Sequence, residues 1–260
     1  MNILEKIILN KKKEVAFLRE QIAFNALEKS NLFSRTTLSL SDFILNSDRS
    51  GIITEFKRKS PSGGIINSHS GVEEVAKGYS DAGASGLSIL TDNLFFGGST
   101  SDILQVRDFI DIPILRKEFI IDEIQVLESK AVGADAILLI ASVLEKTQIL
   151  RFATLSRSLN MEVLLEIHSL KELEYVNEHV NIIGVNNRDL DTLTTNVSLS
   201  YMLADKIPGE FVKISESGIS NAQTVIDLRD VGYNGFLIGE YFISKQNPVT
   251  AFADFVKKIK

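Results

Sequence analysis

From residue 51 onward, short runs of Ile, Val and Leu alternate with longer stretches in which apolar and polar positions are mixed. The alternation repeats about every 20 to 35 residues, as a succession of βα units requires. Most of the apolar runs have no polar face, which is typical of parallel strands covered by helices. Eight runs are predicted to be strands: Ile52–Phe56, Gly86–Leu90, Ile112–Leu115, Ala136–Ile140, Glu162–Glu166, Ile182–Val185, Val212–Ser215 and Gly235–Ile238.

The mixed stretches predict a helix after each strand. Several of them end at a glycine, such as Gly83, Gly133 or Gly232, which can adopt the left-handed backbone that terminates a helix. The alternation indicates a (β/α)8 TIM barrel. A doubly wound open sheet is the alternative, but the chain has neither GxGxxG nor GxxxxGK[ST] phosphate loops. The predicted helices are Val72–Asp81, Ser101–Phe109, Asp122–Ala131, Glu145–Leu159, Leu170–Glu178, Ser198–Asp205, Asn221–Val231 and Pro248–Lys258.

Residues before the first strand form a region of a different kind. Apolar residues recur there close to helical spacing, at Ile3, Leu4, Ile7, Ile8, Val15, Leu18 and Ile22. We therefore expect an N-terminal helical extension over residues 1–50, with a further helical turn at Ser41–Leu45, capping a catalytic barrel domain over residues 51–260. The basic run from Lys11 to Lys13 is interpreted as a solvated helix face.

Composition narrows the class of protein. A chain of 260 residues with 44% hydrophobic residues can form one α/β barrel around a large core. No apolar run approaches the roughly 20 residues of a membrane-spanning helix. The first residues are charged where a signal peptide would be apolar, so we expect a cytoplasmic protein with no membrane partner.

The absence of cysteine excludes disulfides, thiolate nucleophiles and sulfur-ligated metals. His69, His168 and His179 lack the close spacing of a zinc site, so no metal is assigned and each is interpreted as a surface residue or a support behind the site. A net charge of −6 and a pI near 5.3 argue against nucleic acid as a partner.

Charged side chains follow strands that are otherwise apolar. Glu55 and Lys57 are two residues apart and project to one side of the first strand; taken alone, they would be interpreted as a structural ion pair. Other strands end in Lys117, Glu166, Asn186 and Glu216. Such groups are costly to bury unless they are paired, and active sites of barrels lie at the carboxyl ends of strands. An ammonium at Lys117 and a carboxylate at Glu166 or Glu55 indicate acid–base chemistry at a carbonyl carbon.

Two late loops indicate an anionic ligand. Ser217-Gly218 after the seventh strand and Gly239 after the eighth would leave backbone N–H groups close to a phosphate. The stretch from Ser60 and Pro61 to Gly64 is either a mobile loop beside the site or an ordinary connector. Phe95 and Phe96 either stack on an aromatic ring or pack under the N-terminal extension.

Seven segments, each at a predicted strand end, together resemble the indole-3-glycerol phosphate synthase family over nearly the whole chain. They are ITEFKRKSPSGG at 53–64, LSILTDNLFFGGS at 87–99, PILRKEFIID at 113–122, LLEIH at 164–168, GVNNRDL at 184–190, SESGIS at 215–220 and FLIG at 236–239.

The resemblance implies conversion of a carboxyphenylamino-deoxyribulose phosphate to indole-3-glycerol phosphate, with loss of carbon dioxide and water and without a cofactor. It implies that Lys117 is the general acid and that Glu166 assists the later proton removal. Lys57 would hold the substrate carboxylate or phosphate, and Glu55 would organise the lysines. The other implied residues are Asn186, Arg188 and Glu216 at the anthranilate end, Phe96 in the aromatic wall, and Ser60, Ser217, Gly218 and Gly239 at the phosphate; Pro61 accompanies Ser60.

The chain departs from the family pattern at Glu240-Tyr241, where many relatives carry a serine. Two other functions stay open: an aldose–ketose isomerase of similar architecture, which uses a cysteine base that this chain lacks, and a non-catalytic barrel subunit. The expected partner is a small phosphorylated substrate, and association with other tryptophan-pathway enzymes is left open.

Overall fold

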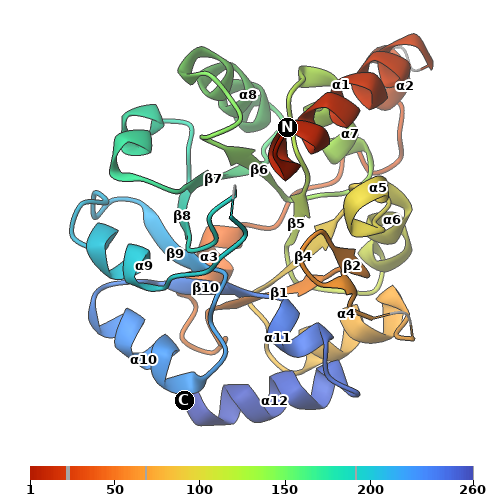
Figure 1. Cartoon of the computed structure of the whole chain (residues 1–260). Coiled ribbons are helices and arrows are strands. Elements are labelled where there is room, and N and C mark those ends of the chain that lie inside the picture. Colours follow the sequence, from red (N-terminus) through yellow and green to blue (C-terminus); the bar gives the residue numbers. More distant parts are fainter. Residues whose placement is uncertain (22–23, 68, 191, 260) are drawn as a thin grey trace.

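Eight parallel strands close into a barrel in the order β1-β10-β9-β8-β7-β6-β5-β4, and Figure 1 looks into it with the helices around the outside. This computed structural model describes residues 1–21, 24–67, 69–190 and 192–259; Ile22 lies outside them. The strands are β1 (Ile52–Phe56), β4 (Gly86–Leu90), β5 (Ile114–Lys117), β6 (Ala136–Ile140), β7 (Glu162–Ile167), β8 (Ile182–Asn186), β9 (Val212–Glu216) and β10 (Gly235–Ile238). The predicted TIM barrel is confirmed.

Side chains of the strands are buried on both sides of the sheet. Ile53, Leu115, Leu164 and Ile214 belong to one buried cluster that includes the helix below the barrel. Intervening residues such as Ile52 belong to a larger cluster shared with the outer helices. Because side chains alternate along a strand, residues two positions beyond an inward-facing one also face inward.

The outer helices are α4 (Val72–Asp81), α6 (Thr100–Arg107), α7 (Glu123–Ala131), α8 (Lys146–Ser158), α9 (Ser198–Leu203), α10 (Ala222–Asp230) and α12 (Pro248–Ile259). Asp122 and Asn221 cap the N-termini of α7 and α10 with their side chains. Gly83, Gly133 and Gly232 have φ of 92°, 92° and 98°, so the predicted helix ends are correct. No helix of the described residues is long and apolar enough to cross a membrane.

Two predicted elements need correction. The third strand begins at Ile114 and not at Ile112, because Pro113 has no N–H to contribute to the ladder. The segment predicted as helix Leu170–Glu178 is a 3-10 helix, η1 (Leu170–Tyr175), and none of its residues is buried. Leu173 and Tyr175 are only partly buried against the core, so this segment has less of the packing that stabilises an α-helix.

Four short elements follow the strands and were absent from the prediction. They are the antiparallel pair β2 (Lys59–Ser60) and β3 (Gly64–Ile65) and the single-turn helices α5 (Asn93–Phe96) and α11 (Glu240–Ile243). The stretch interpreted as a mobile loop or a connector is therefore a small hairpin. Segments of two to four residues are too short for hydrophobic periodicity to reveal.

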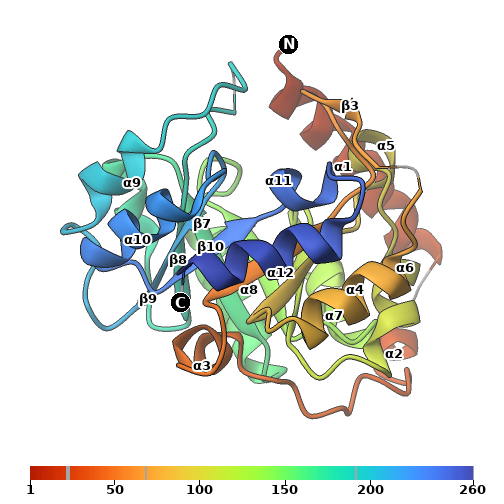
Figure 2. The same cartoon turned by 90° about the horizontal axis from the view of Figure 1, so that it is seen from below.

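The N-terminal region forms α1 (Ile3–Gln21), α2 (Phe24–Leu27) and α3 (Leu40–Leu45), and α3 coincides with the predicted helical turn. Figure 2 shows the start of α1 and α3 at opposite ends of the barrel. Leu40 and Ile44 of α3 are buried in the lower barrel cluster. Gly86 and Gly235 make room for them, because a Cβ at either position would lie within 3 Å of those side chains.

The prediction of a solvated basic face on α1 is wrong for Lys11. Its exposed fraction is 3%, and it lies between Ile7 and Val15 on the buried stripe of the helix. Lys12 and Lys13 are exposed, as expected. Lys11 is buried because the carboxylates of Asp92 and Glu118 lie under this stripe.

We predict that Leu40→Ala lowers the free energy of unfolding by about 2 to 5 kcal/mol, since it opens a cavity at the base of the barrel. Leu45→Ala on the same helix is the control, because Leu45 is 56% exposed. It should change the free energy of unfolding by about 0.5 kcal/mol or less. Urea unfolding of both variants measures the difference, and equal losses would contradict the packing role of α3.

Candidate active site

Four charged side chains form one layer at the carboxyl end of the barrel. Glu55, Lys117, Glu166 and Glu216 come from β1, β5, β7 and β9, which alternate around the barrel. Barrel interiors are filled by such layers of four residues from alternate strands. Here, the layer nearest the mouth is ionic instead of apolar. The sequence placed these residues at strand ends, and the structure brings them together.

Lys117 is the centre of this layer. Its Nζ atom lies 2.8 Å from Glu166 Oε2 and 2.6 Å from Glu216 Oε2, and both contacts are hydrogen bonds. The side chains of Glu166 and Glu216 are almost completely buried, whereas that of Lys117 keeps 13% of its surface exposed. The ammonium is therefore held firmly by two carboxylates while part of it faces the open end of the barrel.

Glu55 and Lys57 form the second ion pair of the site. Lys57 follows the last residue of β1, and its Nζ lies 2.8 Å from Glu55 Oε1. The ion pair expected from the local sequence is therefore present, and both of its members line the same cavity as Lys117. Glu55 also raises the pKa of Lys117, so the two pairs interact electrostatically.

Glycines on neighbouring strands leave space for the carboxylates. A Cβ at Gly184 of β8 would collide with Glu216 Oε1, and one at Gly239, directly after β10, would collide with Glu55 Oε1. The role of Gly184 could not be deduced from the chain, because it depends on a side chain of the next strand.

Burial and ion pairing shift the pKa values of the charged groups in this layer in opposite directions. Burial opposes the charge of Lys117, but the carboxylates of Glu166 and Glu216 raise its pKa above the ordinary value. Burial likewise opposes ionisation of Glu166, yet Lys117 lowers the pKa of Glu166 to about 2. For Glu216, burial is the largest effect, and together with the nearby charge of Glu166 it raises the pKa to about 7.

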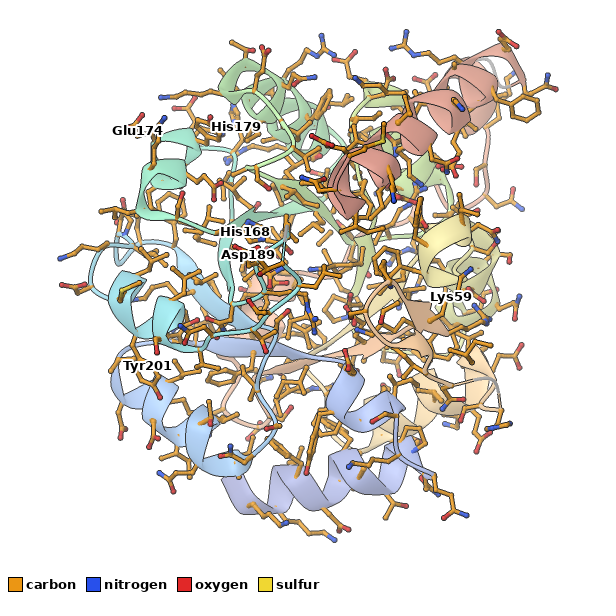
Figure 3. All side chains as sticks on the ribbon, viewed as in Figure 1. Lys59, His168, Glu174, His179, Asp189 and Tyr201 are labelled. Carbon is orange, nitrogen blue, oxygen red and sulfur yellow. The ribbon has the colours of Figure 1, made fainter. Side chains whose placement is uncertain are left out.

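Two polar residues support Glu166. A hydrogen bond with the Asn186 side chain lowers the pKa of Glu166, and the nearby His168 acts in the same direction. His168 Nε2 lies 3.4 Å from Glu166 Oε1. Figure 3 shows His168 nearer the centre of the barrel than His179. His168 thus stands behind the site, as one of the two interpretations had it.

Apolar side chains form the walls of the cavity above the ionic layer. Phe96 and Phe119 contribute rings whose centroids are 6.1 Å apart, tilted by 36°. The same cavity is lined by Leu90, Leu138, Ile140, Leu190 and Leu237. Sequence reasoning missed Phe119, although it comes only two residues after Lys117. A flat aromatic group fits between such walls.

Phe96 also lines an adjoining cavity with Ile3, Leu4 and Ile7 of α1, which agrees with the interpretation that this ring packs under the N-terminal extension. Phe95 instead donates its backbone N–H to Asp92.

Backbone turns occupy the opposite side of the cavity. Ser217 and Gly218 have φ of 65° and 76°, which is a left-handed conformation at two successive residues. Gly239 is the N-cap residue of α11 and directly follows β10. All three line the cavity above the ionic layer, which is called the main cavity below. Turns after the seventh and eighth strands, followed by a short extra helix, are the usual phosphate site of a TIM barrel.

Of the predicted site residues, all but Ser60 and Pro61 line the main cavity, Arg188 among them. Ser60 and Pro61 instead line the adjoining cavity between α1 and the β2–β3 hairpin. There, the Ser60 hydroxyl accepts the Gly63 N–H at 3.0 Å. Arg188 donates to the Leu193 carbonyl at 3.0 Å and lies 3.4 Å from Glu240. The Ser60 hydroxyl is therefore bonded within its own turn.

This arrangement can donate and accept protons at one centre. Lys117 is charged and points to the cavity, Glu166 is ionised beside it, and Glu216 changes protonation near neutral pH. Among the described residues, no group of three or more His, Asp or Glu side chains is arranged to hold a metal ion.

We predict that the raised pKa of Glu216 makes stability depend on pH. Between the ordinary pKa of 4.5 and about 7, folded Glu216 holds a proton that the unfolded chain releases. This stabilisation is present below pH 4.5 and is lost as the pH rises to about 7. The free energy of unfolding of the wild type should therefore fall across this interval relative to that of Glu216→Gln.

Urea unfolding at a series of pH values measures the effect. Glu178→Gln is the control, because this carboxylate belongs to a side chain that is 83% exposed. A difference between wild type and Glu216→Gln that stays constant with pH would contradict the prediction.

Comparisons with known proteins show the family of this chain. A family model described as indole-3-glycerol phosphate synthase matches residues 4–255. A protein of that name from Bacteroides thetaiotaomicron is 46% identical over 259 residues, covering 100% of this chain and 99% of the relative. Proteins of the same name from Laribacter hongkongensis and Carboxydothermus hydrogenoformans are 38% and 37% identical, covering 97% and 94% of this chain and 98% and 96% of theirs.

Solved structures of lower sequence identity share the barrel. A mutant tryptophan synthase α-subunit from Pyrococcus furiosus superposes with a TM-score of 0.62 at 12% identity, covering 82% of this chain and 98% of that one. A 3-hexulose-6-phosphate synthase gives 0.61 at 11% identity, covering 80% and 99%. At such identities the likeness shows the fold alone.

Proposed function

Because the chain belongs to the indole-3-glycerol phosphate synthase family, we propose that it catalyses the reaction for which the family is named. The substrate is 1-(2-carboxyphenylamino)-1-deoxyribulose 5-phosphate, and the product of ring closure, decarboxylation and dehydration is indole-3-glycerol phosphate, in tryptophan biosynthesis. The observation that carries the proposal is the Lys117 ammonium held between Glu166 and Glu216 beneath an aromatic-walled cavity.

Ring closure needs a proton at the ketone oxygen. The ring carbon that bears the carboxylate attacks the carbonyl carbon, and the new C–C bond leaves negative charge on the oxygen. Lys117 supplies the proton that converts this oxygen to a hydroxyl, and its charge stabilises the transition state. Loss of carbon dioxide then returns the bonding electrons to the ring. The carboxylates fix the position of the Lys117 ammonium.

Dehydration then needs a proton acceptor and a group that protonates the departing hydroxyl. Glu166 stays ionised, so it stabilises positive charge on the anilino nitrogen and assists removal of the adjacent C–H proton. Lys117, which gave its proton to the ketone oxygen, first takes up a new proton from solvent through its exposed surface. It then protonates the hydroxyl, which leaves as water, while the neighbouring Glu166 takes the C–H proton. Glu55 keeps Lys57 and Lys117 in place through its charge.

The two ends of the substrate have different partners. The anilino ring lies against Phe96 and Phe119, with Asn186, Arg188 and Glu216 orienting the anthranilate end. The phosphate binds the backbone N–H groups at Ser217, Gly218 and Gly239 and the start of α11. Lys57 holds the carboxylate or the phosphate from the opposite side. Ser60 and Pro61 bind the substrate from the adjoining cavity, which shares Lys57, Phe96 and Arg188 with the cavity above the ionic layer.

We also propose that residues 1–50 act as an extension of the catalytic barrel of residues 51–260. α1 supports this division, because Ile3, Leu4 and Ile7 line the cavity adjoining the site. A cytoplasmic location fits a biosynthetic enzyme that acts on a small phosphorylated metabolite.

We predict that the purified protein converts the anilino-ribulose phosphate to an indole product without added metal or nucleotide. The new indole ring fluoresces, so a continuous fluorescence assay measures turnover. Lack of turnover by the folded protein would contradict the proposal and favour a non-catalytic barrel. Formation of the isomeric sugar phosphate without indole would favour an isomerase.

We predict that Lys117→Ala and Glu166→Gln each lower kcat by a factor on the order of 10² or more, since each removes a positioned proton donor or acceptor. Steady-state kinetics of the two variants test this, with circular dichroism to verify folding. Lys146→Ala is the matched control, because Lys146 is exposed on α8 and should leave kcat unchanged. A near-normal kcat in either variant would remove that residue from the acid–base centre.

A further inference from the structure

We infer that Lys11 of α1 is a positioning residue for the aromatic wall of the substrate cavity. Its buried ion pairs connect the N-terminal helix to the two loops that carry Phe96 and Phe119. The inference rests on the proposed function for its kinetic consequences, but its structural content can be tested independently of activity.

Lys11 contacts three carboxylates from three parts of the chain. Its Nζ lies 3.0 Å from Asp92 Oδ2 and 2.9 Å from Glu118 Oε1. It also lies 2.6 Å from Glu14 Oε2, one turn further along α1. The Lys11 side chain is 4% exposed, Asp92 0% and Glu118 3%. The ion pairs of Lys11 with Asp92 and Glu118 are buried, and so they differ from surface ion pairs, which contribute little to stability.

The two buried carboxylates hold the backbone next to the aromatic wall. Asp92 Oδ1 accepts the Phe95 N–H at 2.8 Å and so caps α5, the helical turn that ends at Phe96. Glu118 Oε1, the atom nearest Lys11, accepts the Phe119 N–H at 2.8 Å. Lys11 therefore fixes the orientation of both carboxylates, and each carboxylate fixes one side of the Phe96–Phe119 pair.

Charge balance makes Lys11 hard to replace. The central buried groups are Lys11, Arg116, Asp92 and Glu118, two positive and two negative. Arg116 lies 3.9 Å from Glu118 but makes its closer contact, 2.6 Å, with Glu128. The Asp92 carboxylate is paired with Lys11. Loss of the Lys11 charge would leave this buried group with an excess negative charge, which drives carboxylates apart or toward water.

The same residue also fixes α1 above the barrel. Ile7 and Lys11 are one turn apart on the buried stripe of the helix, and Ile7 lines the adjoining cavity with Phe96 and Phe119. A shift of α1 would therefore alter the roof of the site as well as its aromatic wall. Both changes affect how the anilino ring is bound, whereas the Lys117–Glu166 pair that handles protons lies deeper in the barrel.

The kinetic experiment compares Lys11→Met, Lys11→Arg and Lys12→Met in the full chain. Lys11→Met keeps the apolar stem and removes the charge, so KM for the anilino-ribulose phosphate should rise about tenfold while kcat falls less than about threefold. Lys11→Arg keeps the charge and should recover most of the wild-type KM. Lys12→Met removes an exposed charge from the same helix and should behave as wild type.

Amide hydrogen exchange gives a second test that needs no turnover. In Lys11→Met, the segments holding the Phe95 and Phe119 N–H groups should exchange at least about tenfold faster, because their acceptors are no longer oriented. In Lys12→Met, they should exchange as in the wild type.

Unchanged exchange and a KM within twofold of wild type in Lys11→Met would overturn the inference. If Lys11→Met does not fold, the double variant Lys11→Met/Glu118→Gln takes its place, because it removes one charge of each sign. Its KM is then compared with that of Glu118→Gln alone, and equal values would overturn the inference. If every protein lacks turnover but exchange responds as expected, the proposed function fails and the positioning role stands.

Discussion

The Lys117 ammonium between two buried carboxylates is the interaction on which the rest of the site depends. Burying one charge in a barrel interior costs several kcal/mol, and the attraction offsets this only when geometry and hydrogen bonding are good. Here Lys117 binds Glu166 and Glu216 at 2.8 and 2.6 Å, and Glu55 adds a third negative charge nearby. Burial, together with the nearby charge of Glu166, raises the pKa of Glu216 to about 7, so Glu216 takes up a proton near neutral pH, whereas Lys117 keeps Glu166 ionised.

Three other parts of the structure enclose the ionic layer. Below it, the barrel cluster closes on Leu40 and Ile44 of α3. Beside it, glycines at 184 and 239 leave the volume that the carboxylates occupy. Above it, α1 is held by a second set of buried charges centred on Lys11. The two ends of the N-terminal region thus close the two ends of the barrel, one by apolar packing and the other by ion pairs.

Much of the fold follows from local pattern, because strands buried on both faces need nearly continuous apolar runs. The predicted bounds of Ile52–Phe56, Gly86–Leu90, Ala136–Ile140 and Gly235–Ile238 agree with the structure. The errors arise where local pattern is weak: at Pro113, which shortens a strand, and in the partly buried 3-10 helix at Leu170–Tyr175. The same limit hid Lys11, since a lysine followed by two exposed lysines has a local pattern typical of a solvated face.

The sequence by itself determined the architecture and the identity of the charged residues at the strand ends, because the alternation of apolar runs and the order of strands in a barrel are properties of the chain. Only the tertiary structure decided which charges meet. Glu55 pairs with its neighbour Lys57, as spacing predicted, but Lys117 meets Glu166 and Glu216 across the barrel, 49 and 99 residues away in sequence. The tertiary structure also decided the protonation states of these carboxyl groups, since the pKa of a carboxyl group depends on its burial and on charges brought close by folding.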